Sequence, residues 1–182
     1  MPKLYLSPSV QEFNRYSGGG SEEYYMFLIA DAMEPYLKAN SIDFDRNSPE
    51  MTLSQVIADS NAKPYELHLA VHSNASPESA SGQNTGVEIY YYPTSQKGRR
   101  FAEILQNNYK AVYREPGDVR VIPTANLAEL RRTKAPAVLI EVGYHDNPGE
   151  AQWIRDNIDT IARALSKSVT EYFGQEFKDP AK

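Results

Sequence analysis

The sequence predicts an α/β protein: a single domain with an open, twisted, mostly parallel sheet of about six strands and helices on both faces. Short apolar runs alternate with longer helical patterns along almost the whole chain, as in a sheet covered by helices. The run 137–142 is nearly all apolar, which is typical of a strand buried on both faces. No internal repeat or linker interrupts this pattern. Residues 1–177 are therefore expected to form one domain, followed by a polar tail at 178–182.

Each predicted element has a local signal. The strands are short runs rich in β-branched and aromatic side chains, whereas the helices repeat apolar residues every three or four positions. Ser21, Thr52, Ser95 and Asn126 stand where a side chain can cap a helix, and Pro148 opens the last one. The predicted strands are residues 4–6, 42–46, 66–72, 86–92, 119–122 and 137–142. The predicted helices are residues 22–39, 52–62, 95–113, 127–131 and 148–173.

The composition limits the classes of protein that fit. The chain of 182 residues has 41% hydrophobic and 24% charged residues, which is ordinary for a globular domain. Its net charge of -5 gives no support for a nucleic-acid or anionic-membrane binder. Cysteine is absent, which rules out disulfides and thiolate ligands. No apolar run reaches the roughly 18 residues that span a bilayer, and the start does not read as a signal peptide.

Ionisable side chains gather at the predicted ends of strands. Glu141 is a carboxylate inside an apolar run, so it is expected either in an ion pair or at the open end of the strand, where ligands bind. Two of the three histidines lie at the ends of predicted strands: His72 is the last residue of one, and His145 follows another. With Glu23 they could supply the imidazole and carboxylate ligands of a zinc site, and a nearby glutamate could take a proton from water.

Structural roles explain the same residues. Arg131 or Arg132 could pair with Glu141, and His145 could orient the loop before the last helix. His68 lies among apolar neighbours and fits a core histidine with a hydrogen-bonded ring better than a metal ligand. From the residues alone, both interpretations stay open.

Five segments carry motifs whose order and spacing are specific. They are residues 22–23, 69–74, 86–91, 126–131 and 135–147. In these segments the chain resembles the zinc-dependent N-acetylmuramoyl-L-alanine amidases of the Amidase_3 type, over about residues 4–173. The resemblance implies a phosphorylase/hydrolase-like fold. It also implies that zinc-activated water cleaves the amide bond between N-acetylmuramic acid and the L-alanine of the peptidoglycan stem.

The resemblance implies roles for individual residues. Glu23, with Glu22 as the alternative register, would be the zinc glutamate, and one Zn²⁺ per chain is expected. His72, followed by Ser-Asn, would be a zinc histidine. Glu141 would be the catalytic glutamate, and Arg131 stands where the family often has an arginine near the site.

One position departs from the family pattern. The family usually has a zinc-binding histidine just after the first strand, whereas this chain has Val10 there and Phe13 at a later alternative position. Neither side chain can bind zinc.

A substitute ligand is expected from Glu12, His145, Gln11 or Asn14. Glu12 and His145 rank first because carboxylate and imidazole are better zinc ligands than amides. Two ligands plus waters could also hold zinc. Finally, the protein could have lost metal and catalysis while keeping a cleft that binds the cell wall.

Three functions therefore compete. The first is a peptidoglycan hydrolase of the autolysin or endolysin kind, and the second is a catalytically inactive peptidoglycan- or muropeptide-binding protein. The third is an unrelated domain that binds a small metabolite, although the glycines at 18–20 lack the lysine and spacing of a P-loop. We expect a monomer that acts on peptidoglycan or muropeptide at the cell wall, outside the cell, without nucleic acid or a membrane span.

Overall fold

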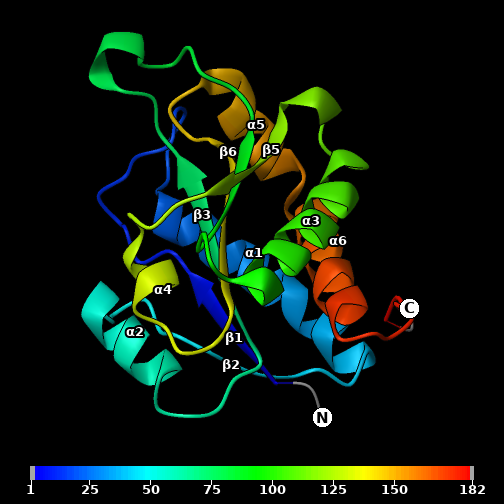
Figure 1. Cartoon of the computed structure of the whole chain (residues 1–182). Helices are drawn as coiled ribbons and strands as arrows, with labels where there is room; N and C mark the ends of the chain where they lie inside the picture. Colours follow the sequence, from blue (N-terminus) through cyan, green and yellow to red (C-terminus); the bar gives the residue numbers. More distant parts are fainter. Residues whose placement is uncertain (1–2, 181–182) are drawn as a thin grey trace.

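The computed structural model describes residues 3–180 and contains one six-stranded sheet with helices on both faces (Figure 1). The strand order is β2-β1-β3-β6-β4-β5. Neighbouring strands run parallel except β4 and β6, which pair antiparallel. The predicted fold class is confirmed.

The strands lie close to their predicted positions. β6 lies between β3 and β4 at the centre of the sheet, and it is almost entirely buried, as its apolar sequence predicts. β3 continues through Ser73 and Asn74, beyond its predicted end, with an irregularity in its pairing to β6 between His72 and Asn74. The strands are β1 (Lys3–Pro8), β2 (Asp43–Arg46), β3 (Leu67–Asn74), β4 (Val87–Tyr91), β5 (Val119–Pro123) and β6 (Ala137–Tyr144).

The helices form two layers of unequal size. In Figure 1, α1, α3 and α6 cover one face, where they share the large apolar core, and α2 and α4 cover the other over two small clusters. No helix within residues 3–180 has the length and apolar character needed to cross a membrane. The helices are α1 (Glu22–Ala39), α2 (Leu53–Ser60), α3 (Gln96–Lys110), α4 (Ala128–Arg131), α5 (Pro148–Asp156) and α6 (Ile158–Tyr172).

The capping predictions are confirmed at three of four helices. Ser21, Thr52 and Ser95 each accept a hydrogen bond from a backbone N–H in the first turn. Asn126 was predicted wrongly, because α4 begins one residue later, after Leu127, with no side-chain cap.

The predicted last helix is in fact two helices. α5 ends at Asp156 and α6 begins at Ile158, with Asn157 between them. The apolar periodicity continues across this break, which explains why the sequence pattern alone joined the two helices.

Candidate active site

The carboxyl ends of β1, β3 and β6 lie side by side at one edge of the sheet. Because these strands are parallel, the loops that follow them meet at this edge. The loop after β1 leads into α1, whose start returns to the same place, since the N–H of Glu22 donates to the carbonyl of Asn14 at 2.9 Å. Side chains that are distant in the sequence are thereby brought together.

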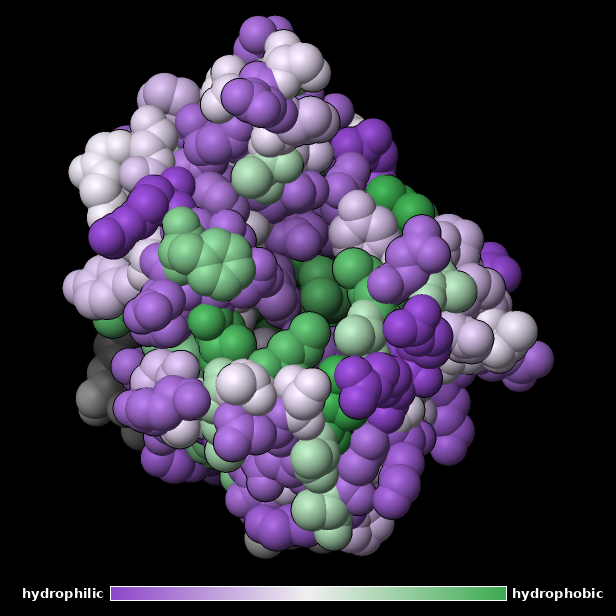
Figure 2. All heavy atoms as spheres, turned by 90° about the vertical axis from the view of Figure 1, so that its left-hand side faces the viewer, coloured by the Kyte–Doolittle hydropathy of each residue, from purple (hydrophilic) through white to green (hydrophobic). Residues whose placement is uncertain are grey.

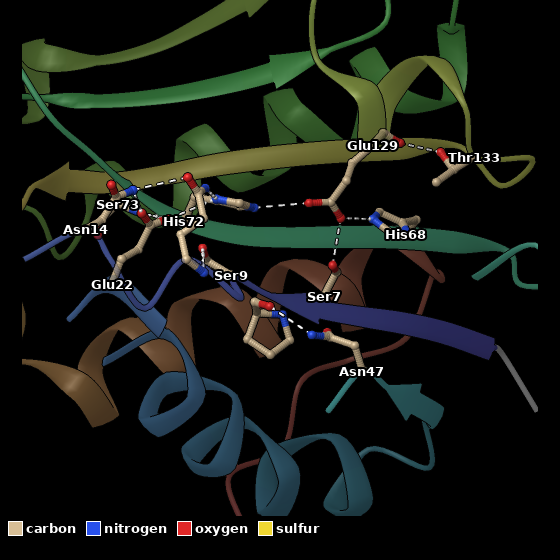
Figure 3. A network of polar contacts seen from close by, with 12 residues as sticks. Ser7, Ser9, Asn14, Glu22, Asn47, His68, His72, Ser73, Glu129 and Thr133 are labelled. Carbon is tan, nitrogen blue, oxygen red and sulfur yellow. Dashed lines mark hydrogen bonds and ion pairs between the residues drawn. The ribbon is translucent and has the colours of Figure 1, made fainter. Parts of the chain in front are cut away.

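Glu22 and His72 form a buried pair at this edge (Figure 3). Oε1 of Glu22 lies 2.9 Å from Nδ1 of His72, and Glu22 is 1% exposed. Burial opposes both charges, but the contact outweighs burial and lowers the pKa of Glu22. Likewise, Glu129 and Glu22 overcome the burial of His72 and hold its pKa well above the ordinary value. Without a metal ion, the imidazole is therefore a cation between two carboxylates.

Two amides complete the surroundings of this pair. Nδ2 of Asn14 donates to Oε2 of Glu22 at 2.6 Å and to Oε1 of Gln11 at 3.2 Å. Nε2 of Gln11 lies 3.3 Å from Nδ1 of His72. Nδ1 thus faces a carboxylate oxygen and an amide N–H, and one ring nitrogen cannot donate to the first while it accepts from the second. A cation at Nδ1 would fit only with the amide of Gln11 turned, so that its oxygen, which accepts from Asn14 in this arrangement, faces the ring instead.

The other ring nitrogen of His72 faces Glu129. Nε2 of His72 lies 3.1 Å from Oε1 of Glu129. Oε2 of Glu129 accepts from the hydroxyl of Ser7 at 2.6 Å and lies 2.8 Å from Nε2 of His68. Figure 3 shows Glu129 reaching from α4 toward these side chains of β1 and β3. Burial opposes the charge of Glu129, but His68 and His72 hold its pKa far below the ordinary value.

Glu141 is on β6. It is paired in register with His72 of the neighbouring strand β3, and with Glu88 of β4, the strand on the other side of β6. Its Oε2 is buried and has no hydrogen-bond partner among residues 3–180. Burial raises the pKa of Glu141 to about 7; His72 opposes the rise, and Glu22, Glu88 and Glu129 add to it. A carboxyl group that titrates near neutral pH and has a free oxygen is suited to take up and release a proton.

A cleft of about 840 Å³ opens over these side chains, within the range of small-ligand sites. Its walls come from residues 10–13, from α2 and from the start of α4. Figure 2 shows hydrophobic side chains gathered around a hollow on this face, and two of the wall residues, Phe13 and Leu53, are 73% and 44% exposed. The polar part of the lining includes Ser7, Ser9, Gln11, His72, Glu129 and Glu141.

At the start of α1, the structure brings Glu22 rather than Glu23 to His72. Successive helical residues point about 100° apart, so only one of the two adjacent glutamates can face the end of β3. Glu22 is the one that contacts His72, whereas Glu23 is partly exposed at the cleft. Burial and the nearby charges of Glu12 and Glu50 raise the pKa of Glu23.

The two first-ranked substitute ligands lie elsewhere. Glu12 is exposed at the cleft, and its neighbour Gln11 is the residue that reaches His72. Nδ1 of His145 lies 2.9 Å from the carbonyl oxygen of Ser73, and the ring stacks on Tyr16. The geometry therefore favours Gln11, which sequence reasoning ranked lower.

Two other sequence predictions concern side chains near the site. His68 is fully buried, and its ring contacts the hydroxyl of Ser60 at 2.8 Å as well as Glu129, so it is the hydrogen-bonded core histidine that was predicted. Arg131 is exposed and lines a separate depression with Tyr92, away from the cleft. The structure does not bring Arg131 together with Glu141.

Glu129 is the residue that sequence reasoning missed. It stands between Leu127 and Leu130, just before the central strand, in a segment that carries the family resemblance. A carboxylate at such an apolar position could have been recognised as buried, and hence as paired. Its partners, Ser7 and His68, could not have been recognised in the same way, because they are distant from Glu129 in the sequence.

The donors around His72 decide whether a metal would fit. Within residues 3–180, no group of three or more His, Cys, Asp or Glu side chains is arranged to hold a metal ion. Glu129 cannot join Glu22 on one ion bound by His72, because the two carboxylates face opposite ring nitrogens. Glu22, Nδ1 of His72 and the amide of Gln11 do lie together, beside the unpaired oxygen of Glu141. This set fits zinc with two good donors and one weaker donor.

Comparisons with known proteins identify the family of the chain. A family described as N-acetylmuramoyl-L-alanine amidase matches residues 11–171. The chain is 29% identical over 139 residues to N-acetylmuramoyl-L-alanine amidase CwlM of Bacillus licheniformis, over 73% of this chain and 51% of that protein. It is 28% identical over 112 residues to the probable cell wall amidase LytH of Staphylococcus aureus, over 59% of this chain and 35% of that protein. The chain thus spans about half of the length of the first relative and about a third of the second.

Solved structures show the same fold. N-acetylmuramoyl-L-alanine amidase AmiC2 of Nostoc punctiforme superposes with a TM-score of 0.81 at 17% identity, over 96% of this chain and 98% of that one. The CwlD amidase of Clostridioides difficile, solved in complex with the GerS lipoprotein, superposes with a TM-score of 0.82 at 14% identity. The superposition covers 96% of this chain and 99% of that one.

Proposed function

Because the chain belongs to the N-acetylmuramoyl-L-alanine amidase family, we propose that it hydrolyses the amide bond between N-acetylmuramic acid and the L-alanine of the peptidoglycan stem, with one zinc ion, at the cell wall. The state of the Glu141 carboxyl group is the observation that carries this proposal. This carboxyl group has a pKa of about 7 and an oxygen without a protein partner, and it lies beside the Glu22–His72 pair in an open cleft.

Three residues would hold the zinc ion. Glu22 and Nδ1 of His72 are the strong donors. The amide oxygen of Gln11 would be the third after the amide has turned, because its nitrogen faces His72 and its oxygen accepts from Asn14 in the metal-free protein. A bound zinc ion polarises an amide carbonyl and lowers the pKa of a water molecule. It would also replace the proton that Glu22 and His72 share in the metal-free protein.

Glu141 would then move the proton. Its carboxylate accepts a proton from water as the water attacks, and its carboxylic acid gives the proton to the departing amine of L-alanine. The pKa of about 7 belongs to the metal-free protein, and a zinc ion beside Glu141 would lower it, which favours the carboxylate that takes the proton from water. The apolar walls near Phe13 and Leu53 would hold the substrate and exclude bulk water from the polar lining.

One observation favours a second function. An amide is a weaker zinc donor than the histidine that the family usually has, so the site could stay without metal under cellular zinc levels. The cleft would then bind muropeptide without cleaving it.

Zinc content and turnover distinguish the two functions. Purified protein is dialysed against micromolar zinc, its zinc is measured by elemental analysis, and purified peptidoglycan is assayed for new N-terminal alanine. The hydrolase proposal expects about one zinc per chain and release of alanine N-termini that a chelator stops. Muropeptide binding without zinc or turnover would instead establish the binding protein.

A substitution at the weak donor sharpens this test. Gln11→His should tighten zinc binding by about tenfold or more, which corresponds to ~1.4 kcal/mol, because imidazole replaces an amide. Glu12→His is the matched control, since Glu12 is adjacent and exposed but does not reach His72. Equal zinc affinity of the two variants would remove Gln11 from the site.

A further inference from the structure

The ring nitrogen of His72 that faces away from Glu22 contacts Glu129, a residue outside the proposed zinc ligands. We propose that Glu129 is a positioning residue: its carboxylate holds His72 in the tautomer that carries the proton on Nε2, and so directs Nδ1 toward the metal position. This inference rests on the proposed function, because it concerns how the chain prepares one ligand for zinc.

The imidazole of His72 lies between two carboxylates. Glu22 faces Nδ1 at 2.9 Å and Glu129 faces Nε2 at 3.1 Å, so the two carboxylates lie on opposite sides of the ring. A neutral imidazole carries one proton, and an imidazole that binds a metal through Nδ1 carries it on Nε2. Oε1 of Glu129 is the acceptor for that proton.

Glu129 is itself held in place by several contacts. Ser7 donates to its Oε2 at 2.6 Å, and Nε2 of His68 lies 2.8 Å from the same oxygen. The hydroxyl of Thr133 donates to the backbone carbonyl of Glu129, which ties down the short helix α4. With Glu129 5% exposed, its carboxylate has a fixed position from which to orient His72.

Glu129 would also affect how strongly His72 binds a metal ion. A carboxylate that accepts a hydrogen bond from the free nitrogen of a metal-binding histidine raises the basicity of that histidine, and its loss typically weakens metal binding about 10–100-fold. Because the third donor of this site is an amide, the contribution of His72 matters more than in a site with two imidazoles. Glu129 would thus partly offset the missing histidine.

Glu129→Gln tests this inference, because the amide keeps the shape of the side chain and removes its charge. Zinc dissociation constants are measured by competition with a chromophoric chelator for wild type and variant. We expect about 10–100-fold weaker binding in the variant. Glu150→Gln is the control: Glu150 is another fully buried carboxylate, it is hydrogen-bonded to Tyr113, and its hydrogen bonds include none to His72 or Glu22, so its substitution should leave zinc affinity unchanged.

A spectroscopic readout separates positioning from a general effect on folding. The chain has only three histidines, so ¹⁵N NMR of the zinc-loaded protein can resolve His72. We expect the proton of His72 on Nε2, slowly exchanging in the wild type and in Glu150→Gln, and faster exchange in Glu129→Gln. The proton on Nδ1, or equal zinc affinity in wild type and Glu129→Gln, would overturn the inference.

The wild type alone tests the proposed function. If it binds no zinc, the zinc hydrolase and the role of Glu129 are both wrong. If it binds zinc and Glu129→Gln binds equally well, only the role of Glu129 is wrong.

Discussion

Glu141 and Glu150 both place a buried carboxylate oxygen near the end of β6, but their surroundings differ. Glu150 is fully buried and accepts hydrogen bonds from the hydroxyl of Tyr113, from Arg114 and from the backbone N–H groups of Gly86 and Tyr144. Oε2 of Glu141 accepts none from the described part of the chain. Burial alone therefore does not mark a working residue. Glu141 differs from Glu150 because its unpaired oxygen coincides with a raised pKa and a place in the lining of the cleft.

Substitution of Glu141 should have the largest effect on activity. Glu141→Gln should lower peptidoglycan hydrolysis by about 10²–10⁴-fold, because the amide cannot accept a proton from water. Zinc content and the far-ultraviolet circular dichroism spectrum should match the wild type. Turnover by the variant at the wild-type rate would show that another group is the base.

Glu150 should behave in the opposite way. Glu150→Ala leaves Tyr113, Gly86 and Tyr144 without their buried acceptor, so the free energy of unfolding should fall by about 3–5 kcal/mol. Urea denaturation measures this loss. Zinc affinity per folded molecule should be unchanged; a selective loss of zinc binding would place Glu150 in the site as well.

The raised pKa of Glu141 should make the stability of the metal-free protein depend on pH. Its folded pKa of about 7 exceeds the ordinary value of 4.5, so the unfolded chain loses this proton at a lower pH than the folded chain does. Metal-free wild type should therefore lose stability relative to Glu141→Gln as the pH rises from 4.5 to about 7. The full difference is on the order of 3 kcal/mol. Denaturation curves of both proteins in chelator across this range measure it, and a constant difference would contradict the raised pKa.

Local signals in the sequence predicted most of the fold. The apolar run 137–142 predicted the buried central strand, and Ser21, Thr52 and Ser95 predicted three helix starts, because strand burial and capping depend on neighbouring residues. The break at Asn157 was missed because the apolar spacing runs through it.

The site was predicted less completely, since its contacts depend on where distant segments meet. His72 and Glu141 follow from strand ends, and the structure places them in register. The choice of Glu22 over Glu23 depends on how α1 is rotated against β3, and the choice of Gln11 over Glu12 depends on the path of the loop. Glu129 becomes visible only when α4 is placed against β1 and β3.

The position of β6 also has a consequence for the synthesis of the chain. β6 is the last strand to emerge from the ribosome, yet it lies between β3 and β4. Until residues 137–144 are available, both of those strands present an unpaired edge, which is a template for aggregation. Inserting a central strand also requires contacts between distant segments, which form slowly. Glu141 arrives on that same strand, so the nascent chain gains its candidate reactive carboxyl group only in the step that closes the sheet.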